Sequence, residues 1–111
     1  MSSATIVSPT LEKEVDLRSK PLLPWNVVLL DDDHHTYEYV ILMLQRLFGH
    51  SLETAYAMAR EVDSTGRVIV FTTHRERAEL ERDRIHAFGP DPRISACKGS
   101  MSALIEPVGG S

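Results

Sequence analysis

The fold is decided by the stretch Trp25-Asn26-Val27-Val28-Leu29-Leu30-Asp31-Asp32-Asp33. Its first six residues form a short aromatic and β-branched run, which is typical of a buried strand. Pro24 precedes the run, and three consecutive aspartates follow it. We therefore expect a buried strand over residues 25–30 that ends at an acidic cluster.

Two helices are predicted directly after this strand. Over residues 37–48 apolar residues recur at spacings of three and four, and Gly49 can adopt the left-handed conformation that ends a helix. Asp33 or His35 is the expected N-cap of this helix. A second apolar stripe over residues 52–62 predicts another helix, and the short connection makes the two a tight helical pair.

The second half of the chain predicts two more strands and a third helix. Residues 68–71 are β-branched and aromatic, and residues 101–105 have the same character. Thr73 and Glu76 match a capping box, which predicts a helix that Gly89-Pro90 ends. The order β-α-α-β-α-β predicts an α/β (α+β) two-layer sandwich, in which three helices pack on a small three-stranded antiparallel sheet.

The 111 residues leave room for one compact domain with short tails. Residues 1–24 are polar and contain several prolines and serines, so we expect a flexible N-terminal arm. The predicted core covers residues 25–107, and residues 108–111 form a tail.

The net charge of −4 disfavours a main role in binding phosphates, so neither nucleic acid nor an anionic membrane is an expected partner. The longest apolar runs fall far short of the roughly 20 residues that a membrane span needs. Cys97 is the only cysteine, which excludes an internal disulfide and a cysteine cage for zinc. The expected setting is a bacterial or organellar interior, and of these we expect the cytoplasm of a bacterium.

The acidic cluster after the first strand is the main candidate for chemistry. Carboxylates and the adjacent His34 and His35 can bind a metal, but consecutive strand residues point to opposite faces and no metal-ligand spacing accompanies them. Helix capping accounts for one aspartate of the three. We therefore expect no metal and no cofactor.

A cationic ligand explains the cluster better. Neighbouring carboxylates repel one another unless a positive charge is held between them. An ammonium group has three donors and no acceptor, so carboxylate oxygens are its natural partners, and apolar helix faces lie nearby. A peptide N-terminus with a bulky first side chain has this chemistry. The chain contains no recognisable nucleophile or phosphate-binding motif, so we expect no enzymatic activity.

The order of several short segments resembles the ClpS family of Clp-protease adaptors. The resemblance covers about residues 25–106 and rests on residues 27–33, 38–40, 44–49, 59–62, 65–67 and 75–79. It implies a non-enzymatic adaptor that binds substrate proteins by a bulky hydrophobic N-terminal residue, an N-degron. It further implies delivery of these substrates to a Clp-type AAA+ unfoldase (Hsp100), through the N-terminal domain of the unfoldase.

The resemblance also assigns roles to individual positions. Binding of the α-amino group falls to Asp31, Asp32 and Asp63. Unfoldase docking falls to Glu76 and Glu81. The side-chain pocket consists of six residues: Tyr37, Val40, Leu42, Ala59, Val62 and Met101.

Two departures from the family pattern bear on specificity. Asp63 replaces a histidine, which either strengthens the attraction for an ammonium group or marks a site that has lost its usual ligand. Tyr37 and Ala59 stand where methionines usually line the pocket mouth, so the preferred residue can differ. The alternative function is a general protein-interaction module of the same fold that has lost or changed N-degron binding.

Overall fold

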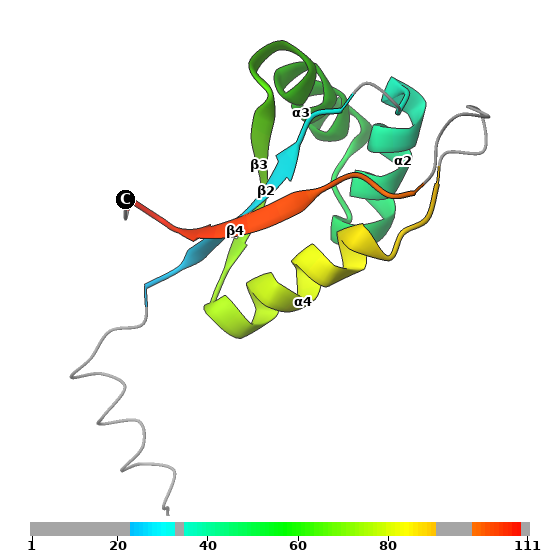
Figure 1. Cartoon of the computed structure of the whole chain (residues 1–111). Coiled ribbons are helices and arrows are strands. Elements are labelled where there is room, and N and C mark those ends of the chain that lie inside the picture. Colours follow the sequence, from blue (N-terminus) through cyan, green and yellow to red (C-terminus); the bar gives the residue numbers. More distant parts are fainter. Residues whose placement is uncertain (1–22, 33–34, 91–98, 110–111) are drawn as a thin grey trace, which may run out of the picture.

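Strand β2 (Trp25–Leu30) is the middle strand of an antiparallel three-stranded sheet with the order β3-β2-β4 (Figure 1). Strand β3 (Arg67–Thr73) lies along one edge of β2, and β4 (Ala103–Pro107) lies along the other. Because both edges are paired, the centre of β2 is completely buried, as its apolar run predicts.

The computed structural model describes residues 23–32, 35–90 and 99–109. The predicted arm lies outside these residues except for Leu23 and Pro24, and so do the last two residues of the predicted tail. The Pro24 carbonyl accepts a hydrogen bond from the Val108 N–H, which holds the two ends of the described core together.

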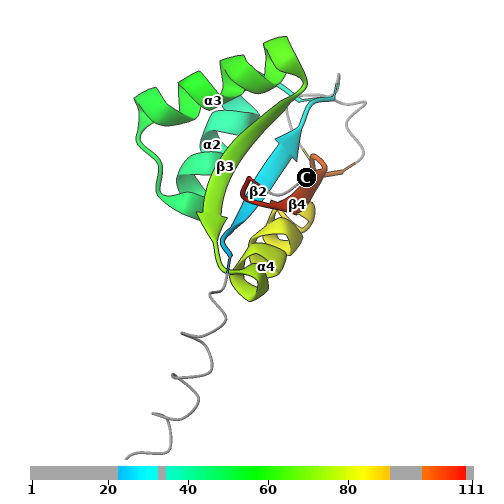
Figure 2. The same cartoon turned by 90° about the vertical axis from the view of Figure 1, so that its left-hand side faces the viewer.

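Helices α2 (Tyr37–Phe48) and α3 (Leu52–Thr65) pack side by side, and α4 (Arg75–His86) lies separately along the sheet (Figures 1 and 2). One face of the sheet contributes to the core under these helices through alternate residues such as Val27, Leu29 and Val70. On the other face Ile69 and Leu104 are exposed. The two-layer sandwich and its β-α-α-β-α-β order are therefore confirmed.

The ends of α2 and α3 show why the helices begin and end where they do. Thr36 is the N-cap of α2, since its hydroxyl oxygen accepts a hydrogen bond from the Tyr39 N–H. This corrects the prediction for His35, and Asp33 lies outside the described residues. Gly49 and Gly66 end α2 and α3 with φ angles of 71° and 91°, values that favour glycine.

The predicted capping box of the third helix is wrong. Thr73 is the last residue of β3, and His74 occupies the N-cap position of α4 without a side-chain cap bond. The helix ends at His86, before the Gly89-Pro90 pair that was expected to end it. A β-branched residue such as Thr73 continues a strand well, and here pairing with Trp25 of β2 outweighs the capping pattern.

Glu81 faces the core from α4, between Ala78 and Ile85, with 0% of its surface exposed. Its carboxylate accepts hydrogen bonds from the guanidinium groups of Arg77 and Arg84, whose side chains are 47% and 39% exposed. A buried carboxylate with two charged donors is well satisfied. Glu81 is therefore not available for direct contact with a partner, which corrects its predicted role in unfoldase docking.

We predict that Glu81→Ala lowers the free energy of unfolding by about 1–3 kcal/mol, because it leaves a gap in the core and two guanidinium groups without their acceptor. Glu76→Ala on the exposed side of the same helix is the control, with an expected change within about 0.5 kcal/mol. Urea denaturation measures both variants. An equal loss of unfolding free energy in the two variants would contradict a structural role for the Glu81 carboxylate.

Candidate functional site

The chain at the end of β2 is hydrogen-bonded on both sides. The Leu30 N–H donates to the Ser102 carbonyl, and the Asp31 N–H donates to the Gly66 carbonyl, both at 3.0 Å. Gly66 is the residue that ends α3. These two bonds place the start of the acidic cluster beside the C-terminal end of α3.

A small cavity of about 30 Å³ lies at this junction. Its lining includes all the residues predicted for α-amino binding and for the side-chain pocket except Leu42, which is half-buried on α2. The lining consists of Asp31, Asp32, His35, Tyr37, Val40, Ala59, Val62, Asp63 and Met101. The fold thus brings together residues that are up to 70 positions apart in the sequence (31 to 101).

The cavity has an apolar floor and an acidic rim. Four almost completely buried residues, Val40, Ala59, Val62 and Met101, form the floor and belong to the hydrophobic core. The rim carries the aspartates, of which Asp31 and Asp63 are exposed and Asp32 is half-buried. This arrangement suits a ligand with a positive charge next to an apolar group.

His35 belongs to the site, although the sequence suggested only capping or a metal for it. Its Nδ1 lies 2.8 and 2.9 Å from the two carboxylate oxygens of Asp32, and its Nε2 lies 2.8 Å from the Gly99 carbonyl oxygen. The side chain is 3% exposed, and its ring contacts that of Tyr39 at 4.4 Å between centroids. His35 therefore fixes Asp32 and connects it to the segment before Met101.

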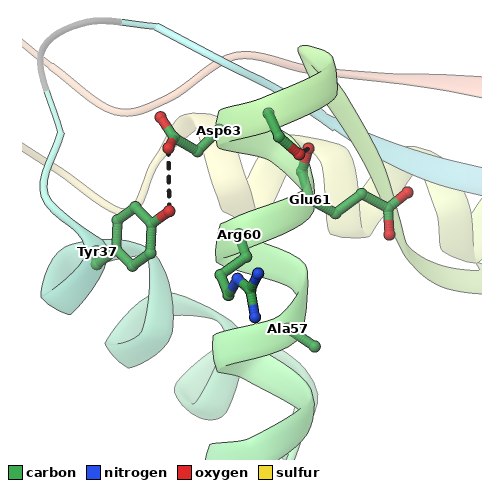
Figure 3. A pocket seen from close by; sticks show the side chains of 6 residues that line it. Tyr37, Ala57, Arg60, Glu61 and Asp63 are labelled. Carbon is green, nitrogen blue, oxygen red and sulfur yellow. Dashed lines mark hydrogen bonds between the residues drawn. The ribbon is translucent and has the colours of Figure 1, made fainter.

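Tyr37 and Asp63 line one side of the cavity, and their side chains point toward each other (Figure 3). The Tyr37 hydroxyl at the start of α2 donates a 3.0 Å hydrogen bond to the Asp63 carboxylate near the end of α3. This bond, and the negative charge of Asp63, raise the pKa of Tyr37 above its usual value of about 10. The two side chains form a polar wall that α2 and α3 build jointly.

A second, larger hollow of about 480 Å³ lies on the other side of this wall. Tyr37 and Asp63 line both spaces, and the remaining lining comes from the outer face of α3: Ala57, Arg60, Glu61 and Ser64. This hollow was not predicted, because the residues on the outer face of α3 follow no recognised motif.

Metal binding finds no support in the described part of the chain. Within residues 23–32, 35–90 and 99–109, no group of three or more His, Cys, Asp or Glu side chains is arranged to hold an ion. Asp33 and His34 lie outside these ranges. No helix in the described ranges is long and apolar enough to cross a membrane.

The family described as "ATP-dependent Clp protease adaptor protein ClpS" matches residues 20–91, which include β2, the acidic cluster and helices α2, α3 and α4. The chain belongs to the ClpS family. The match confirms the resemblance to the ClpS family that the sequence motifs indicated.

Curated members of the ClpS family match most of the chain. The ATP-dependent Clp protease adapter protein ClpS of Corynebacterium diphtheriae is 27% identical over 89 residues, which cover 78% of this chain and 79% of the relative. The protein of the same name from Mycobacterium marinum is 31% identical over 78 residues, which cover 70% and 77%.

A solved structure shows the same fold. The structure of Agrobacterium tumefaciens ClpS2 bound to L-phenylalaninamide superposes with a TM-score of 0.66 at 22% identity. The match covers 77% of this chain and 96% of the ClpS2 chain.

We predict that Asp63→Asn lowers the pKa of Tyr37 toward about 10, because the neutral phenol loses its carboxylate acceptor and the phenolate loses an adjacent negative charge. The raised pKa means that the bond is present at neutral pH and is lost as the pH rises through the pKa of Tyr37. An NMR titration of labelled tyrosines measures the pKa of Tyr37, and the Tyr37→Phe variant identifies its signal. An unchanged pKa would contradict the bond.

Proposed function

We propose that this ClpS-family adaptor binds the N-terminal residue of substrate proteins, a bulky hydrophobic residue with a free α-amino group. Asp31, Asp32 and Asp63 would bind the ammonium group, and the apolar floor of the cavity would receive the side chain. The observation that carries the proposal is the meeting of an acidic rim and an apolar floor in one cavity.

The acidic rim supplies the acceptors that an ammonium group needs. An ammonium group donates three hydrogen bonds, and each carboxylate oxygen can accept more than one. Asp32 can therefore hold an ammonium group while it remains bonded to His35. Asp63 provides a further carboxylate where the family commonly has histidine, and its negative charge adds to the attraction for a cation.

The cavity must widen to accept a large side chain. Its volume of about 30 Å³ is close to the share of one water molecule in the liquid, which is about 30 Å³. Tyr37 is the side chain best placed to move, because it is 36% exposed. Its movement would break the hydrogen bond from its hydroxyl to Asp63. When Tyr37 swings away, the ligand's ammonium group replaces the phenol as the partner of Asp63.

The ligand of the ClpS2 structure has the required chemistry. L-phenylalaninamide carries an α-amino group and an aromatic side chain, and its carboxyl group is an amide, as in a peptide. That complex belongs to the Agrobacterium protein. It supports the proposal because the shared fold and the acidic rim of this chain suit the same chemical group.

The bound substrate would then pass to a Clp-type AAA+ unfoldase in the bacterial cytoplasm. We propose that the adaptor performs no chemistry itself and docks on the N-terminal domain of the unfoldase through the exposed side of α4. Glu76 lies there in the first turn, exposed to solvent. Because Glu81 is buried, the exposed parts of Arg77 and Arg84 supply the further charged groups on this surface.

Titration with short peptides that begin with Phe, Leu, Tyr or Trp tests the binding proposal. We expect N-acetylation to weaken binding at least tenfold, because it removes a charged donor worth about 1.5–3 kcal/mol. Asp32→Asn should weaken binding of the free peptide by a similar factor. Glu53→Gln, an exposed acidic residue in the first turn of α3, is the control and should leave affinity unchanged.

Equal affinity for free and acetylated peptides, or no binding of either, would contradict N-degron recognition. In that case the alternative of a general interaction module of the same fold would gain support.

The role of Tyr37 is tested with Tyr37→Phe. Loss of the hydroxyl frees Asp63 without removing the aromatic ring, so we expect affinity for a Phe-initiated peptide to rise about twofold to fivefold. Tyr56→Phe is a matched control, since Tyr56 forms an edge-to-face ring pair with Tyr37 at 6.0 Å. Weaker binding by Tyr37→Phe would show that the hydroxyl contacts the ligand instead of closing the cavity.

A further inference from the structure

The larger hollow beside the candidate site contains a cationic side chain. Arg60 lines it from α3 and is exposed. Most other arginines of the described residues form ion pairs with acidic side chains: Arg67, Arg75, Arg77, Arg82 and Arg84. Within residues 23–32, 35–90 and 99–109, Arg60 forms no such pair, and neither does Arg46, which lies in the last turn of α2.

The hollow adjoins the candidate binding cavity. Tyr37 and Asp63 line both spaces. A peptide that places its first side chain in the small cavity and its ammonium group at Asp63 has its next residues at this shared wall. The volume of about 480 Å³ on the other side falls in the range of ligand pockets and can hold a residue of a peptide.

Among the residues that line the hollow, Arg60 is positively charged and Glu61 and Asp63 are negatively charged. The ammonium group of the ligand would offset part of the negative charge of Asp63 and so weaken its repulsion of an anion. Glu61 projects to the side of α3 away from Tyr37, whereas Arg60 extends along the face between α3 and α2 (Figure 3). Arg60 is therefore a positively charged group beside the path of a peptide that leaves the Tyr37–Asp63 wall.

We propose that this hollow binds the second or third residue of a substrate and that Arg60 makes the adaptor prefer an acidic side chain there. The inference rests on the proposed binding of N-terminal residues. A guanidinium group can donate two parallel hydrogen bonds to a carboxylate, which gives the preference a geometric basis as well as a charge.

The experiment compares peptides that begin with Phe and carry Glu or Gln at position 2, at position 3 or at position 6. For the full-length protein we expect Glu to bind about twofold to fivefold tighter than Gln at position 2 or 3, as for a solvent-exposed ion pair, and equally at position 6. The difference should shrink at 1 M salt, where the Debye length is about 3 Å.

Variants assign the preference to Arg60. Arg60→Gln should remove it, and Arg60→Glu should reverse it toward a Lys-containing peptide, while both variants still bind the Gln peptide. Glu61→Gln is the matched control from the same helix and should keep the preference or increase it. A preference that survives Arg60→Gln would overturn the inference.

Other outcomes separate this inference from the proposed function. If the Phe-initiated peptides bind but Glu and Gln are equivalent at positions 2 and 3, the inference is overturned and N-terminal recognition stands. If no peptide with a free α-amino group binds, both are overturned.

Discussion

The site depends on the pairing of β2 along both of its edges. This pairing continues past the end of the strand, through the N–H groups of Leu30 and Asp31 to carbonyls on opposite sides. A slip of one residue would turn the buried side chains to the other face, so the register is firmly specified. The register also determines the position at which the acidic cluster leaves the sheet. Exposed aspartates are thus anchored by the most buried segment of the molecule.

The same core supports both stability and the cavity. Val40, Ala59, Val62 and Met101 are core residues that also form the cavity floor. Small residues on α3, such as Ala55 and Ala59, allow α2 and α3 to pack closely. Larger side chains at the floor would therefore disturb packing as well as alter the shape of the cavity. The acidic rim lies outside the core, where its charges can be varied with less effect on folding.

Local patterns predicted the order of the elements, and the family resemblance named most of the residues that line the cavity, although not His35. Contacts between distant residues were not predictable. The apolar spacing of α2 and Gly49 are local signals, and they led to the right helix. The bond from His35 to Gly99 joins residues 64 positions apart, and no local pattern encodes it. Glu81 was misplaced for a similar reason: in a helix rich in charged residues, hydropathy does not show which carboxylate faces the core.

The wall of Tyr37 and Asp63 has a thermodynamic consequence because it is common to two spaces. A group that draws Asp63 away from the phenol changes the surface of both spaces at once. Their occupants therefore cannot contribute independently to affinity. Reciprocity requires that whatever the first residue does for the binding of its neighbour, the neighbour does equally for the first. The two halves of an N-terminal dipeptide would be sensed as one cooperative unit.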